Sequence, residues 1–218
     1  MKHEQIKKLT VLAMLCAVAY AAVALVRIPV VLFLNYEPKD VIIAFGGFLF
    51  GPLASLAISV VVSFIEMVTI SDTGWIGLVM NVLSTAAFAC TAALVYRKKH
   101  TLGGAVFGLV LGTLLMTAIM LLWNYILTPL YMNTARADVA AMLVPVFLPF
   151  NLIKGSLNTA ITILLYRPLV QGLRRAGLFP ESNTLTPPAK KSKLAVWLCA
   201  VAVLIVCVLL ILSYNGII

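Results

Sequence analysis

Charged residues are scarce in this sequence, and acidic ones most of all. Of its 218 residues, 11% are charged, only seven are Asp or Glu, 63% are hydrophobic, and the mean hydropathy is +1.10. Soluble domains of this size do not have such a composition. The scarcity of charge therefore excludes a water-soluble globular protein and predicts an all-α, polytopic membrane protein that lies in the lipid bilayer.

Motifs for catalysis are also missing. The chain has no Walker A sequence, no HExxH and no GxSxG. Its two histidines, His3 and His100, stand in basic stretches, which favours solvated side chains over catalytic ones. We therefore expect no enzyme activity, no metal site and no cofactor. If the protein moves a solute, the energy must come from an ion gradient or from a partner ATPase.

Cysteine pairs that could form a disulfide framework are absent as well. Cys16, Cys90, Cys199 and Cys207 all lie in apolar segments, and their spacing matches no metal motif. Thiols in membrane helices rarely form disulfides, so we interpret the four as small apolar side chains.

Seven apolar segments are predicted as membrane helices, over residues 9–26, 41–50, 53–70, 75–96, 102–126, 144–166 and 194–212. The first follows a basic start and could also be a signal peptide, but it has the length to span and more spans follow at once. The second is short, with Asp40 expected as its N-cap. Residues 1–170 are predicted as a six-span core, 171–193 as a cytoplasmic basic linker, and 194–218 as an extra, lipid-facing helix.

The basic residues are distributed unevenly between the loops. The net charge of +9 could indicate nucleic-acid binding, but in a membrane protein such residues more often record topology, so we expect no nucleic-acid partner. With the N-terminus inside, the outer loops hold only Arg27, Lys39 and Arg136. The inner segments hold twelve basic residues: Lys2, Lys7, Lys8, Arg97, Lys98, Lys99, Arg167, Arg174, Arg175, Lys190, Lys191 and Lys193. This bias predicts a multi-pass cell-membrane protein with a cytoplasmic N-terminus and an outer C-terminus.

The segment from residue 145 to 162 carries an unusual polar face. Asn151, Lys154 and Asn158 stand at helical spacing i, i+3 and i+7 within an apolar stretch. A lysine near the middle of a span costs roughly 2.5–3.5 kcal/mol on insertion scales, and such residues usually face a bundle interior or a wet cavity. The alternative is a lysine that snorkels to an interface. We favour a pocket for a small molecule, opening outward.

Other polar residues in the spans have two interpretations each. Asn81 and Asn124 could bond a ligand or merely a neighbouring helix. Glu66 is either the partner of a buried cation or, as its closeness to the SDTGW turn favours, a headgroup-level residue. Pro145 and Pro149 should break or delay the start of the sixth helix and free carbonyls toward a cavity.

Small residues recur every four positions in the first span, at Ala13, Ala17 and Ala21. Such a stripe allows a second helix to approach closely, although alanine richness alone would also produce it.

Three segments resemble a known family. WNYILTPLYM followed by LPFNLIKG is similar to the substrate-binding S components of energy-coupling factor (ECF) transporters, particularly the riboflavin-specific kind, and FGPLA at residues 50–54 resembles a turn of that family. The resemblance covers about residues 5–170. It implies a six-helix protein that captures a vitamin on the outer side, associates with a transmembrane T subunit and two ABC-type ATPases, and topples in the membrane to release it.

The resemblance also implies roles for particular residues. Asn124, Asn151 and Lys154 match positions that bond the flavin ring edge, and the alanine stripe matches the motif that docks on the T subunit. NYEPKDV departs from the family's loop before the second helix, where only Asp40 clearly matches. We expect Asp40 and Asn81 to be substrate-binding residues as well. Val62 and Ser63 replace a Lys-Asn pair of the third helix, which leaves an S component for another small molecule as an alternative. A membrane enzyme or proton-coupled carrier using Glu66 and Lys154 is a further alternative, disfavoured by the lack of an inverted repeat.

Overall fold

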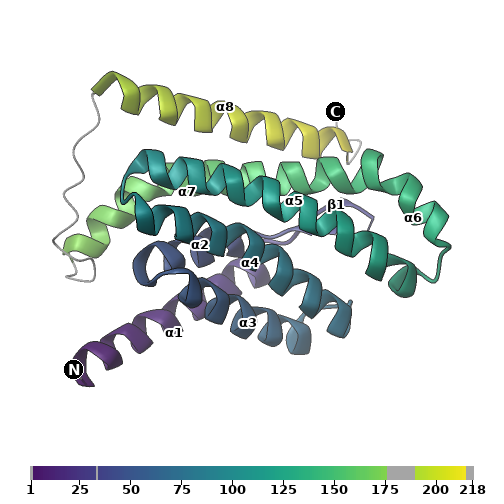
Figure 1. Ribbon diagram of the computed structural model, residues 1–218, viewed down its shortest axis with the longest axis horizontal. Helices are drawn as coiled ribbons and strands as arrows, with labels where there is room; N and C mark the ends of the chain where they lie inside the picture. Colours follow the sequence, from purple (N-terminus) through teal and green to yellow (C-terminus); the bar gives the residue numbers. More distant parts are fainter. Residues whose placement is uncertain (1, 33, 176–189, 215–218) are drawn as a thin grey trace.

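The computed structural model describes residues 2–32, 34–175 and 190–214, and nearly all of them are helical. Figure 1 shows the long helices running roughly side by side as one bundle. The helices are α1 (Lys2–Leu25), α2 (Lys39–Phe50), α3 (Pro52–Thr69), α4 (Gly74–Lys98), α5 (Leu102–Met132), α6 (Arg136–Met142), α7 (Leu148–Arg175) and α8 (Lys190–Tyr214). A π-helical turn, η1 (Leu143–Phe147), joins α6 to α7.

The predicted all-α membrane fold is confirmed. Within the described residues, six helical stretches are long and apolar enough to cross a bilayer: α1, α3, α4, α5, α6–α7 and α8. The predicted second span is different, because α2 has only 12 residues and would reach about 18 Å. Nine of those residues are buried, so α2 is an internal helix of the bundle rather than a full span.

The segment between α1 and α2 is a β-hairpin and not the loop that we expected. Strands β1 (Ile28–Val31) and β2 (Leu34–Tyr36) pair antiparallel. The preceding helix ends at Leu25, four residues before Pro29. Proline disfavours a helical conformation in the residue directly before it, and that residue, Ile28, begins β1. Val30, Leu34 and Tyr36 are buried, so this hairpin packs onto the helices.

The chain after the fifth span is also more ordered than predicted. Helix α5 continues to Met132, past the predicted end at residue 126, with Pro129 inside it. Part of the loop expected between the fifth and sixth spans forms α6. The two prolines of the sixth span do delay its regular helix, because η1 precedes α7 and contains Pro145.

Helices α4 and α5 form the most extensive contact in the bundle, and glycines make it possible. A Cβ atom on Gly112 would lie 2.5 Å from the Phe88 carbonyl oxygen, and one on Gly108 would lie 2.8 Å from the Ala92 carbonyl oxygen. The backbones therefore approach more closely than any side chain would allow.

Helix α8 is not simply lipid-facing, as the sequence had suggested. It lies along α7, on the side of the bundle away from α1 (Figure 1). Ala200, Cys207 and Ile211 are buried, while the opposite face is exposed. Of the predicted linker at 171–193, the first part belongs to α7 and the last part to α8, and residues 176–189 lie outside the described residues.

We predict that Gly112→Ala lowers the thermal midpoint of the detergent-solubilised protein. Overpacking costs about 1–3 kcal/mol, which exceeds the helix-propensity gain of at most about 1 kcal/mol. Gly103→Ala is the matched control, because its Cβ would meet nothing closer than 4.0 Å. A Gly112→Ala protein as stable as Gly103→Ala would mean that the α4–α5 contact is not tight.

Candidate ligand-binding site

A cavity lies at the end of the bundle where α1 and α5 end and α7 begins. It encloses about 700 Å³ free of protein atoms, its open mouth included. Its walls come from β2, α4, α5 and α7, and from the segments around Arg27, Glu37 and Thr73. The lining residues are Arg27, Leu34, Asn35, Glu37, Thr73, Ile76, Gly77, Met80, Asn81, Ser84, Met120, Thr128, Tyr131, Phe150, Asn151 and Lys154.

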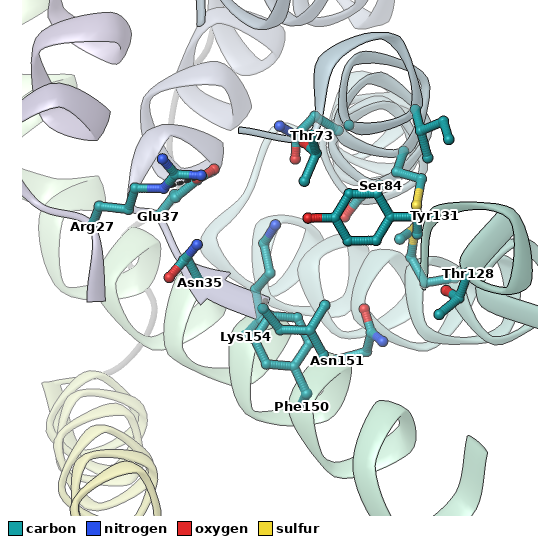
Figure 2. A pocket seen from close by; sticks show the side chains of 16 residues that line it. Arg27, Asn35, Glu37, Thr73, Ser84, Thr128, Tyr131, Phe150, Asn151 and Lys154 are labelled. Atoms are coloured by element: carbon teal, nitrogen blue, oxygen red, sulfur yellow. Dashed lines mark ion pairs between the residues drawn. The ribbon is translucent and has the colours of Figure 1, made fainter. Parts of the chain in front are cut away.

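Helix α7 supplies one polar wall. Asn151 and Lys154 both line the cavity, and Lys154 is only 6% exposed, so it does not snorkel. Figure 2 shows the Lys154 amine and the Tyr131 hydroxyl pointing toward the same central space. The Asn151 amide donates to the Phe147 carbonyl of η1 (2.7 Å), which leaves its side-chain oxygen as the acceptor for the cavity.

Asp40 acts from behind this wall and does not line the cavity. Its carboxylate accepts hydrogen bonds from Thr85 (2.6 Å) and from the Asn158 amide (3.1 Å), and it lies 3.6 Å from the Lys154 amine. The predicted N-cap role is wrong, because Pro38 occupies the cap position and Asp40 lies within the first turn of α2. Asn158 lies at this second layer too, where it accepts a hydrogen bond from the Tyr36 hydroxyl (3.0 Å).

Glu66 is buried, so its expected position at headgroup level is wrong. Its carboxylate pairs with the Lys39 amine, which also lies 2.7 Å from Glu37. Lys39 is completely buried, although the sequence had placed it in an outer loop. Asn81 donates to the other oxygen of Glu66 (3.2 Å) and lines the cavity as well. The ion pairs therefore connect the cavity wall to the last turn of α3.

Arg27 and Glu37 form an ion pair at the cavity mouth, drawn as a dashed line in Figure 2. Their closest N–O distance is 3.4 Å, and Arg27 also donates to the Ile70 carbonyl (2.9 Å). Burial raises the pKa of the Glu37 carboxyl, but Lys39, Lys154 and Arg27 lower it by more, so the net shift is downward. Glu37 is therefore held as a carboxylate beside the cavity.

The other predicted site residues lie at different depths. Asn81 is at the cavity, as described above. Asn124 is fully buried one turn from Met120 and Thr128, which do line it. Its amide donates to the Met120 carbonyl (2.7 Å), and its side-chain oxygen accepts from Thr128 (3.1 Å). That any of these residues binds a ligand stays a prediction.

Sequence reasoning missed several lining residues. Ser84 is the most informative, because it is 2% exposed and its hydroxyl has no hydrogen-bond partner among the described residues. Asn35 and Glu37 lie between two predicted spans, where the sequence alone indicates a loop. The apolar residues on either side of them are the one sequence signal that this segment is packed against the bundle.

The alanine stripe lies on the open side of α1. Ala13, Ala17 and Ala21 are all exposed, whereas Ala19 and Val23 face the bundle. Within the described residues the stripe is thus free to contact another helix.

Comparison with known proteins identifies the family. The family model for the substrate-specific component of ECF transporters matches residues 7–166, which is most of the chain. The chain belongs to this family. The resemblance inferred from LPFNLIKG and WNYILTPLYM is thereby confirmed.

Several relatives of this substrate-specific component carry informative names. The riboflavin transporter RibU of Staphylococcus aureus is 31% identical over 79% of this chain and 95% of its own length. The riboflavin transporter FmnP of Bacillus subtilis is 28% identical over 79% of this chain and 98% of its own length. A solved structure, described as the S component of a bacterial ECF transporter, superposes with a TM-score of 0.68 at 30% identity, covering 78% of this chain and 99% of the other.

We predict that Ser84→Ala weakens ligand binding by this substrate-specific component about threefold to tenfold, the value of one neutral hydrogen bond. Stability should not fall, because the hydroxyl has no hydrogen-bond partner among the described residues. Ser59→Ala is the matched control, since Ser59 is equally buried and unpartnered in the described residues but does not line the cavity. Titration with the ligand of both purified variants makes the comparison. Equal affinities for the two would remove Ser84 from the site.

Proposed function

We propose that this substrate-specific component captures riboflavin in the cavity between β2, α4, α5 and α7. The single observation that carries the proposal is the lining: a buried ammonium, amides and hydroxyls stand among apolar side chains in a pocket of this family's fold. The names of the similar proteins, both riboflavin transporters, support the same ligand.

The lining suits the chemistry of a flavin. The pyrimidinedione edge of the ring alternates carbonyl acceptors with an N–H donor. The Lys154 ammonium can donate to a carbonyl, and the free oxygen of Asn151 can accept from the N–H. Met80, Met120 and Phe150 supply apolar surface for the ring faces. The polar residues nearer the mouth, including Asn35 and Thr73, suit the hydroxyls of the ribityl chain.

The cavity would open to the outer side of the cell membrane. It lies at the end of the bundle opposite the N-terminus and the basic Arg97–His100 segment. The positive-inside bias puts those basic segments in the cytoplasm. The position of the C-terminus on the outer side follows from the same orientation, because α8 is one further span.

Transport would need partners that supply energy. The chain has no nucleotide-binding motif, so we propose that it works with a transmembrane T subunit and two ABC-type ATPases, as its family implies. The exposed stripe of Ala13, Ala17 and Ala21 would be the docking face, because small residues allow close helix contact.

Riboflavin binding can be tested directly on the purified chain. We expect the protein to purify with a bound flavin, visible in its absorbance spectrum, or to quench the fluorescence of added riboflavin. A flavin-free preparation that also ignores added riboflavin would contradict the proposal and favour an S component for another small molecule. Other vitamins, tested by the shift that they cause in the thermal midpoint, would then identify the ligand.

We predict that Lys154→Met weakens riboflavin binding at least about tenfold, because a charge-assisted hydrogen bond is lost. This variant also leaves the Asp40 carboxylate without its cation, which would destabilise the fold. The control is Lys154→Met combined with Asp40→Asn, which removes both charges and should restore the thermal midpoint. If the double variant binds riboflavin as tightly as the unmodified protein, Lys154 does not contact the ligand.

We predict that Ala17→Leu abolishes uptake and leaves riboflavin binding unchanged. The larger side chain would hold the T subunit away from α1 without touching the cavity, which Ala17 does not line. Val18→Leu, an exposed neighbour off the stripe, is the control. Uptake of labelled riboflavin by cells that also express the partner subunits, set against binding by the purified variant, separates the two steps. Normal uptake by Ala17→Leu would exclude this docking face.

A further inference from the structure

Helix α8 is an addition to the family's fold. The family model ends at residue 166, and the solved S component covers 99% of its own chain on only 78% of this one. Nothing in those matches therefore says what α8 does.

One face of α8 is built to pack against the bundle. Ala200, Leu204, Cys207 and Ile211 follow one another at spacings of four, three and four residues, so they form a single stripe. Ala200, Cys207 and Ile211 are between 4% and 6% exposed. The neighbouring Ile205 is 52% exposed, which shows how sharply the packed and open faces differ.

The outer half of this stripe meets the wall of the candidate site. Cys207 and Ile211 belong to the apolar cluster that contains Leu34 and Tyr36 of the hairpin and Phe150 of α7. Leu34 and Phe150 themselves line the cavity. The α8 side chains thus share one apolar cluster with two residues of the cavity wall, and α8 also contacts β1 directly.

The hairpin depends on such packing. An isolated two-stranded hairpin is at best marginally stable, and it needs a helix or further strands against it. Polar contacts hold the open end of the hairpin, among them the hydrogen bond from Tyr36 to Asn158 and the ion pairs of Glu37 with Arg27 and Lys39. The apolar side chains of the hairpin, including Leu34, pack in one cluster with residues of α6, η1, α7 and α8.

We propose that Ile211 and Cys207 of α8 are positioning residues for the ligand site. They hold the β1–β2 hairpin in place as one wall of the cavity and thereby slow the release of a bound ligand. The identity of the ligand in this inference rests on the proposed function, whereas the packing of α8 against the hairpin does not. It assigns to the added helix a role in ligand retention rather than in anchoring alone.

The first test measures hairpin mobility without any ligand. Hydrogen–deuterium exchange in the intact chain should be faster at the backbone amides of β1 and β2 in Ile211→Ala than in the unmodified protein. Ile205→Ala is the matched control, because it removes the same atoms from the exposed face of α8 and should change nothing. Exchange in α4 reports global destabilisation and should stay unchanged in both variants. Equal hairpin exchange in Ile211→Ala and Ile205→Ala would overturn the proposal.

The second test measures release of riboflavin. We expect Ile211→Ala to release it at least about threefold faster, with little change in the association rate, because affinity changes within one site act mainly on dissociation. Ile211→Leu, which keeps the volume, should restore slow release. If Ile211→Ala does not fold, Cys207→Ala replaces it in this test, because it removes fewer atoms from the same apolar cluster. Release rates equal to that of Ile205→Ala for both positions would overturn the retention role.

The two tests separate the possible failures. If the unmodified chain binds no riboflavin, the proposed function fails, yet hairpin exchange still decides whether α8 positions the wall. If riboflavin binds normally and the hairpin exchanges equally in all variants, only the role of α8 fails.

Discussion

The structure depends on a balanced set of charges inside an apolar bundle, all of them buried except Arg27, which is partly exposed at the cavity mouth. Three cations and three carboxylates lie close together, joined by ion pairs: Arg27, Lys39 and Lys154 with Glu37, Asp40 and Glu66. A single unpaired charge at this depth would be very costly, because removing one partner of a buried pair typically costs about 3–5 kcal/mol. The pairs also have a structural consequence. They connect the end of α1, the hairpin segment, α2, α3 and α7, so that the cavity wall and the bundle interior are one unit.

The short helix α2 makes this arrangement possible. A full-length span would carry its first residues to the membrane surface, whereas α2 starts within the bundle and buries Lys39 and Asp40 in its first turn. Lys39 then faces the acids of the hairpin segment and α3, and Asp40 faces α4 and α7. The hairpin bridges the remaining height on the outer side and brings Leu34 and Asn35 to the cavity. The polar pocket thus exists because α2 does not extend to the outer surface of the membrane.

Much of the architecture could be predicted from periodicity and composition. The apolar stretches marked all the long helices, and the polar face of α7 correctly indicated a cavity beside Asn151 and Lys154. The prediction failed where the partner of a residue is distant in sequence. A sequence pattern reports only local context, which places Glu66 beside the SDTGW turn and Asp40 at the start of a helix. Their real partners, Lys39 and Lys154, stand 27 and 114 residues away.

The sequence by itself determined that this is a helical membrane protein, the approximate extent of its spans, and its membership of the S-component family. Those properties follow from hydrophobicity and local motifs, which each segment carries on its own. Only the tertiary structure decided which polar residues face the cavity, which ones stand behind it, and that α8 packs against the hairpin's apolar cluster. These outcomes depend on pairing between segments that are distant in the sequence. A buried charge or an apolar stripe indicates that a partner is needed, but the residues around it do not show which segment supplies that partner.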